Sequence, residues 1–146
     1  QLPAHLRPGA AEAPFQRLAQ RETIAARGRL HHDDAVERVT AALATQGFGI
    51  LTDIDVAATM KKKLGTDMAP YRILGACHPA MAARALALES RIGTMLPCNV
   101  ILRAVEGGVE VSAIDPAASM QAIENAELTA VAGQVSDLLA KAVEAI

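Results

Sequence analysis

VILRAVEGGVEVSAI, residues 100–114, is the stretch of the sequence that decides the fold. Two apolar runs, 100–105 and 109–114, flank the tripeptide Glu106-Gly107-Gly108. Consecutive glycines suit the mirror-image turns that join the two strands of a tight hairpin. The stretch therefore predicts an antiparallel β-hairpin, and it argues against an all-helical chain or a purely parallel sheet.

Three segments upstream of this hairpin predict further strands. Residues 22–30 alternate imperfectly between apolar and polar side chains, and residues 71–77 form a short apolar run. In residues 48–56 the apolar side chains stand at even spacing, which is typical of a half-buried strand. Asp53 and Asp55 alternate with these apolar residues. We therefore expect both carboxylates on the face opposite the core.

Four segments predict helices. Residues 32–46 place their apolar side chains on one stripe, with two aspartates in the first turn and Gly47 at the position of a left-handed cap. A short helix over 57–64 carries three consecutive lysines. A helix over 79–89 begins with proline, which the first helical turn favours. The last helix, 128–143, repeats its apolar side chains every three or four residues for four turns.

The predicted order of elements is therefore β-α-β-(α)-β-α-β-β-α. This order indicates an α+β domain with a mixed, largely antiparallel sheet and with helices packed on one face. We expect this single domain to cover residues 21–146. Residues 1–20 contain three prolines and little periodicity, so they predict a flexible leader.

Composition and charge exclude several classes of protein. The 146 residues are 51% hydrophobic and 21% charged, as in ordinary globular domains. A net charge of −2 and an aromatic content of 2% argue against nucleic-acid binding, which needs cations and stacking side chains. No apolar run approaches the roughly 18 residues of a membrane span, and no signal peptide is visible. We therefore expect a cytoplasmic protein without membrane contact, in which both cysteines are thiols.

Five segments, taken in order, carry a resemblance to a known family. They read GFGILTDID (47–55), KKKLG (61–65), YRILGACHP (71–79), LPCNV (96–100) and AIDP (113–116). Over residues 21–146 the chain resembles domain-of-unknown-function family 302, which is widespread in bacteria and archaea. The resemblance implies an α+β fold related to the TATA-binding-protein-like folds, and it implies a homodimer, but it implies no activity. His78 departs from the family pattern, which usually has asparagine there.

Two of these segments place a cysteine beside a proline at the end of a predicted strand. We expect both segments to line one cleft that binds a small ligand. Thiolate and imidazole donors suit zinc or copper, so the sequence predicts a soft-metal site made by Cys77, His78 and Cys98. Haem is a further candidate cofactor. The remaining residues expected to line the cleft or its rim are Lys63, Tyr71, Pro97 and Asn99.

Two other functions stay open. Cys77 lies just before the helix that begins at Pro79, and a helix N-terminus favours the thiolate form of a nearby cysteine. Cys77 is therefore a candidate nucleophile in a protein that handles thiols or persulfides. Alternatively, both thiols are buried and inert in a structural dimerisation module, because free cysteines are commonly buried. A binding protein is preferred to an enzyme, and no catalytic residue is assigned.

The run Lys61-Lys62-Lys63 is compatible with an anion site that also uses Arg72. A lysine run on a short helix is more commonly a solvated face, and we prefer that interpretation.

Overall fold

The computed structural model describes residues 24–27 and 32–146. The predicted leader, residues 1–20, lies outside the described residues. Of the strand predicted over 22–30, the described part is strand β1 (Ile24–Arg27).

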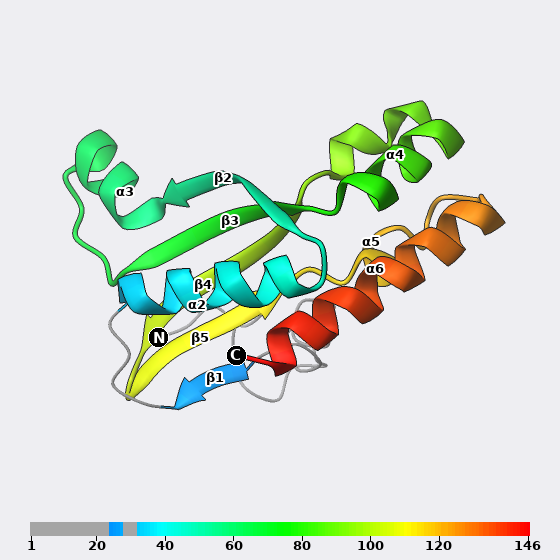
Figure 1. Cartoon of the computed structure of the whole chain (residues 1–146). Coiled ribbons are helices and arrows are strands. Elements are labelled where there is room, and N and C mark those ends of the chain that lie inside the picture. Colours follow the sequence, from blue (N-terminus) through cyan, green and yellow to red (C-terminus); the bar gives the residue numbers. More distant parts are fainter. Residues whose placement is uncertain (1–23, 28–31) are drawn as a thin grey trace, which may run out of the picture.

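Five strands form one sheet in the order β1-β5-β4-β3-β2 (Figure 1). The other four strands are β2 (Gly49–Asp55), β3 (Tyr71–Cys77), β4 (Cys98–Val105) and β5 (Gly108–Ala113). Each neighbouring pair of these described strands is antiparallel, so no parallel pair is mixed into this part of the sheet. The α+β class is confirmed.

The hairpin of β4 and β5 forms as the sequence predicts. Val105 pairs with Gly108, which leaves Glu106 and Gly107 as the loop. Gly107 has a φ of 86°, a conformation that glycine adopts without a steric penalty. The hairpin contributes three fully buried side chains to the core: Val100, Leu102 and Val111.

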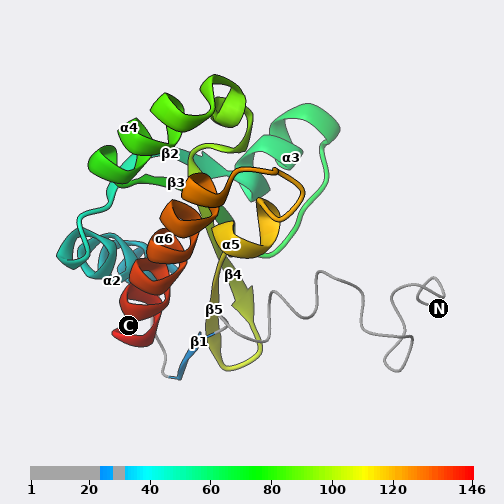
Figure 2. The same cartoon turned by 90° about the vertical axis from the view of Figure 1, so that its right-hand side faces the viewer.

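Helices α2 (His32–Thr45) and α6 (Ala126–Glu144) pack on one face of the sheet, as Figures 1 and 2 show. The predicted cap of α2 is confirmed, because Gly47 has a φ of 86°. None of the described helices is long and apolar enough to cross a bilayer. The helix side chains that pack on the buried strand residues are Ala35, Val39 and Leu43 of α2 and Leu139, Ala142 and Val143 of α6.

A second, smaller core lies beyond the end of the sheet (Figure 1). It is built by α4 (Pro79–Leu88), the 3₁₀-helix η2 (Ser90–Met95), α5 (Pro116–Ser119) and the first half of α6. Val135 of α6 packs against both cores, so α6 links them. The sequence analysis did not predict η2 and α5, because helices this short have no apolar period of their own.

Two predictions about strand β2 are wrong: that it is half-buried, and that its aspartates lie on the face opposite the core. It is not half-buried: only Ile50 is partly covered, and the other six residues are exposed. The register with β3 shifts between Ile50 and Thr52, and one inserted residue moves every later side chain to the other face. Asp53 therefore pairs with Leu74 and Asp55 with Arg72, on the face that the helices cover.

Helix α3 (Val56–Leu64) follows β2 directly and contains no buried residue. The Asp55 carboxylate caps it by accepting a hydrogen bond from the Ala58 N–H at 2.9 Å. Gly65, with a φ of 67°, ends it. Strand β2 and helix α3 together form an exposed arm, residues 49–64, at the β2 edge of the sheet (Figure 1).

Candidate functional site

The two predicted cysteine segments meet at one end of the sheet. Ala76, the residue before Cys77, is the direct partner of Cys98 in the register of β3 and β4. A cavity of about 40 Å³ lies there, and Cys77, His78, Pro97 and Cys98 all line it. We call it the cysteine-end cavity. These four residues therefore lie together, as the sequence analysis expected.

Sulfur is concentrated around this cavity. The chain has two cysteines and five methionines, and both cysteines line the cavity together with Met81 of α4 and Met120 at the end of α5. Most of the other lining side chains are aliphatic, from the second core. A cavity with such an apolar lining stays dry and offers a ligand few polar partners other than sulfur.

The two thiols differ in exposure. Cys98 is only 7% exposed, whereas Cys77 is half-buried, and neither is in a disulfide. Cys98 lies on the helix-covered face of β4, in line with Val100. The side chains of successive strand residues point to opposite faces of the sheet, so the Cys77 side chain leaves β3 on the face opposite that of Ala76. Because β3 ends at Cys77, both positions border the same cavity at the sheet end.

His78 is engaged as a helix cap. Its Nδ1 accepts a hydrogen bond from the Met81 N–H at 3.3 Å at the start of α4. Its ring meets Phe48 edge to face with 5.5 Å between ring centroids. A Cβ on Gly47 would lie 2.8 Å from Nε2, so that side of the ring faces backbone. His78 thus positions α4 above the cavity.

The part of the chain that the structure describes contains no group of three or more His, Cys, Asp or Glu side chains placed to hold a metal ion. The predicted three-donor arrangement of Cys77, His78 and Cys98 is therefore not formed. The physical reason is the cap of α4, which engages Nδ1 of the imidazole with the Met81 N–H.

The other predicted site residues do not line the cysteine-end cavity. Asn99 is exposed and pairs with Gly75 on the opposite face of the sheet. Tyr71 begins β3, six residues from Cys77 and so about 20 Å away along the strand. Lys63 is exposed on α3, which also lies at the far end of β2.

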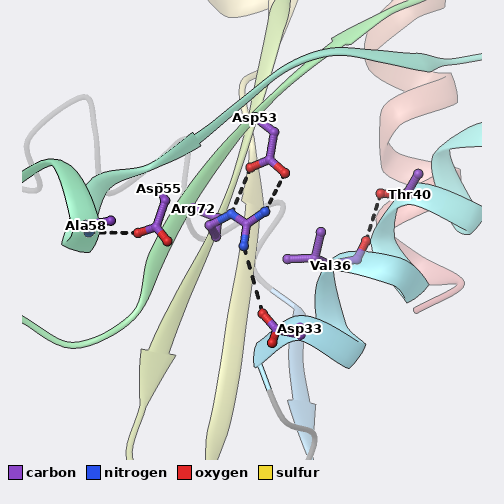
Figure 3. A network of polar contacts seen from close by, with 7 residues as sticks. All are labelled: Asp33, Val36, Thr40, Asp53, Asp55, Ala58 and Arg72. Atoms are coloured by element: carbon purple, nitrogen blue, oxygen red, sulfur yellow. Dashed lines mark hydrogen bonds and ion pairs between the residues drawn. The ribbon is translucent and has the colours of Figure 1, made fainter.

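A charged network that the sequence analysis missed occupies that far end (Figure 3). Arg72 of β3 grips Asp53 of β2 with two hydrogen bonds: Nε donates to Oδ1 at 2.8 Å, and Nη2 donates to Oδ2. Nη1 points toward Asp33 of α2, 3.9 Å from its Oδ1. These hydrogen bonds from Arg72 lower the pKa of Asp53, and the same bonds raise the pKa of Arg72. The sequence analysis missed this network because the bulge in β2 moves Asp53 to the helix-covered face of the sheet.

Arg72 is therefore held by carboxylates and does not join the lysines of α3. Lys61 pairs instead with Asp67 at 3.0 Å, and Lys62 and Lys63 are exposed. This placement agrees with the solvated-face interpretation of the lysine run.

A second, larger cavity of about 480 Å³ lies beside Arg72. Small residues of α3, β4 and β5 line it, together with Tyr71 and several charged side chains. We call it the arginine-end cavity. It lies at the opposite end of β3 from the cysteine-end cavity, and the two share no lining residue.

Comparisons with known proteins agree with this fold. A family model described as "Domain of unknown function DUF302" matches residues 24–146. A crystal structure of an uncharacterised conserved DUF302 protein from Bacillus stearothermophilus is similar, with a TM-score of 0.76 and 24% sequence identity. The match covers 85% of this chain and 97% of that one. At this identity the likeness concerns the fold alone. No curated protein matches the chain.

Proposed function

This chain belongs to the DUF302 family, whose description names no activity, and from its own residues we propose that the protein is a homodimeric Cu(I)-binding protein. The metal would occupy the cysteine-end cavity. One observation carries the proposal: both cysteines and two of the five methionines line a single apolar cavity.

The donor set favours monovalent copper over zinc. Thiolates and thioethers are soft ligands that select Cu(I). Structural zinc sites use four cysteine, histidine or carboxylate donors, and thioethers are not among them. His78 caps α4, and the sulfur donors that line the cavity are the thiolates of Cys77 and Cys98 and the thioethers of Met81 and Met120. The Met81 sulfur lies 3.7 Å from Arg84 Nη1, a weak contact that metal binding would replace.

The volume of the cavity also favours a single metal ion over a larger cofactor such as haem. A volume of about 40 Å³ holds one ion or a few water-sized atoms. Pockets for drug-sized molecules and cofactors span roughly 300–1,000 Å³. Haem does not fit the cysteine-end cavity, so we do not propose it.

Protons compete with the metal in this site. A thiol must lose its proton to become a ligand, so binding of Cu(I) by both cysteines releases two protons. The apparent affinity should therefore fall as the pH falls. The reaction also requires reduced thiols, and for this reason we infer a reducing compartment, the cytoplasm.

The exposed arm supports the homodimer. Leu51 is 66% exposed on β2 and Leu64 is 71% exposed on α3, and Ile54 of β2 is also exposed. Exposed apolar side chains favour a protein partner, and an edge strand offers unpaired backbone groups to it. We infer that residues 49–64 pack against a second copy of the chain.

The metal proposal is tested by titrating the reduced protein anaerobically with Cu(I) in competition with bathocuproine disulfonate. We expect one Cu(I) per chain, and Cys77→Ala and Cys98→Ala should each abolish this binding. Met120→Leu should weaken it, whereas Met60→Leu should not, because Met60 lies on α3 away from the cavity.

Each alternative function has its own signature in the same experiment. If the protein binds no Cu(I) and Cys77 reacts rapidly with a disulfide reagent, the thiol-handling function replaces the metal proposal. If it binds no Cu(I) and neither thiol reacts in the folded protein, the structural dimerisation module replaces it. Unchanged binding by both cysteine variants would also contradict the proposed site.

A further inference from the structure

Three isoleucines form a row across the face of strands β2 to β5 that lies opposite α2 and α6, which we call the open face. Ile54 of β2 pairs with Ile73 of β3, and Ile73 pairs with Ile101 of β4. Residues that lie directly opposite each other on neighbouring strands share a face of the sheet. Leu74 and Val100, which adjoin Ile73 and Ile101 in sequence, are buried in the helix-covered core. Because successive side chains alternate, the three isoleucines point away from the helices.

The open face contributes to neither core. Ile54 is 46% exposed, Ile73 and Ile101 are half-buried, and none of the three belongs to the helix-covered core or to the second core. In strands β2 to β5 the only buried residue on this face is Gly75, which has no side chain. An antiparallel sheet that faces water on one side usually carries polar side chains there. A continuous row of isoleucines therefore indicates a face that another surface covers.

The polar residues around the row carry no net charge. Arg103 donates two hydrogen bonds to Glu110, from Nε to Oε1 at 2.9 Å and from Nη2 to Oε2 at 3.0 Å, so their charges cancel. A two-fold interface brings a surface against a copy of itself, and a neutral face does not repel its copy. An apolar centre within a polar rim is also the usual anatomy of a protein interface. The other polar side chains of the rim are uncharged: Thr52, Tyr71, Asn99 and Ser112.

Two observations favour a second copy of the chain as the cover. Ile54 belongs both to the row and to the exposed arm, for which we have inferred contact with a partner copy, so the two surfaces are continuous. The similar DUF302 structure is matched over 97% of its own length, so the fold that the two proteins share consists of these elements alone. A cover for the open face is not part of that shared fold.

We propose that the open face is the centre of the homodimer interface, where the isoleucine rows of two copies pack face to face across a two-fold axis near Ile73. Sheets that pack in this way lie about 10 Å apart and interdigitate their inner side chains. This inference rests on the proposed homodimer and names the surface that forms it. The exposed arm then flanks this surface.

Solvent exposure of the isoleucine methyl groups tests the interface in the unaltered chain. The δ1 methyl groups are isotope-labelled, and their relaxation by a soluble gadolinium chelate is measured by NMR below and above the dimer dissociation constant, which sedimentation equilibrium provides. We expect the relaxation enhancement at Ile73 and Ile101 to fall severalfold in the dimer. The enhancement at Ile123 should stay unchanged, because Ile123 is also half-buried but packs against the second core.

Each contrary result has a distinct meaning. If Ile54 alone is protected in the dimer, the arm forms the interface without the open face, so this inference fails and the proposed homodimer stands. If Ile73 and Ile101 are already protected in the monomer, another part of the same chain covers them and the inference is wrong. If the chain is a monomer at every concentration, the homodimer itself is wrong, and the inference fails with it.

A pair of variants tests the contribution of the row. Ile101→Thr keeps a β-branched residue in the strand and removes apolar surface from the open face. A two-fold interface contains the substituted residue twice, so the dimer dissociation constant should rise at least about tenfold. Leu86→Thr makes a change of the same kind at an exposed leucine of α4 and should leave the constant unchanged. Circular dichroism checks that both variants fold, and an unchanged constant for folded Ile101→Thr would refute the interface.

Discussion

At the scale of single residues, several side chains that the sequence suggested as ligands or binding groups stabilise the backbone instead. His78 is the clearest example, because a ring that looks like a metal ligand in the sequence accepts the first hydrogen bond of α4. Arg72 and Asp53 are another, because they join β2 to β3 just beyond the register shift between Ile50 and Thr52. Such roles depend on where a side chain points, and spacing along the sequence does not specify this.

The cap at His78 predicts a difference between two substitutions. His78→Asn should be more stable than His78→Ala by about 1 kcal/mol, because asparagine can accept the same N–H bond and alanine cannot. Both variants lose the ring contact with Phe48, so their difference isolates the cap. Urea unfolding at pH 7 measures the two free energies. Equal stabilities would mean that the Met81 N–H finds another acceptor.

Gly75 is predicted to tolerate no side chain. A Cβ there would lie 2.7 Å from Pro97 Cγ and would also collide with Thr52 Oγ1. Gly75→Ala should lower the free energy of unfolding by about 1–3 kcal/mol, the usual effect of overpacking. Gly49→Ala is the control, because a Cβ at Gly49 on β2 would meet nothing within 4 Å. A loss in the two variants of similar size would place the cause in the strand backbone and not in the contact with Pro97.

Asp53 predicts a pH dependence of stability. Its hydrogen bonds from Arg72 lower its pKa below the ordinary value of 3.8. A carboxyl group whose pKa falls on folding stabilises the protein above that value, and the contribution is lost as the pH drops through the lowered pKa. Asp53→Asn should therefore cost up to about 1 kcal/mol at pH 7, as expected for a partly exposed pair. The cost should shrink toward zero near pH 2. Urea midpoints at both pH values test this, and a cost independent of pH would exclude the ion pair as its cause.

At the scale of elements, the sequence predicted each long helix and strand and missed a local irregularity. The hairpin of β4 and β5 and helix α2 follow from apolar periods over many residues and from the glycines at their turn and cap. Helix α6 follows from its apolar period alone. One unpaired residue at the bulge of β2 was enough to reverse the faces of Asp53 and Ile54. The alternation of apolar and polar residues along the sequence does not indicate where a strand contains an inserted residue. The charged network around Arg72 was therefore not predictable, whereas the cysteine segments were, because both lie at strand ends.

The exposed arm predicts a variant that separates assembly from folding. Leu51→Lys places a charge on the exposed edge strand β2, where a partner copy would have to desolvate it. Sedimentation equilibrium should give a dimer for the unaltered chain and a monomer for the variant, with the same circular dichroism. Leu86→Lys on α4 is the control, because Leu86 is exposed but lies outside the arm. A monomeric mass for the unaltered chain at all concentrations would rule out the dimer.

At the scale of the whole molecule, the two cavities lie at opposite ends of one sheet and belong to different packing units. The cysteine-end cavity is lined mainly by the second core, which α6 links to the sheet. The arginine-end cavity lies where α2, α3 and the sheet meet. Cu(I) in the cysteine-end cavity would bind the folded chain and not the unfolded one, so it should raise the thermal stability.

The separation of the two ends of the sheet predicts independent effects. Sites without shared partners contribute independently to the free energy of unfolding. Cu(I) should therefore raise the free energy of unfolding by the same amount, within about 0.5 kcal/mol, in the unaltered chain and in Asp53→Asn, which changes only the contact with Arg72 at the far end of the sheet. Unfolding of both proteins is followed by circular dichroism with and without Cu(I). Cys98→Ala should remove the copper effect. A copper effect that differs between the unaltered chain and Asp53→Asn would show that the sheet transmits a change from one end to the other, and would contradict independent ends.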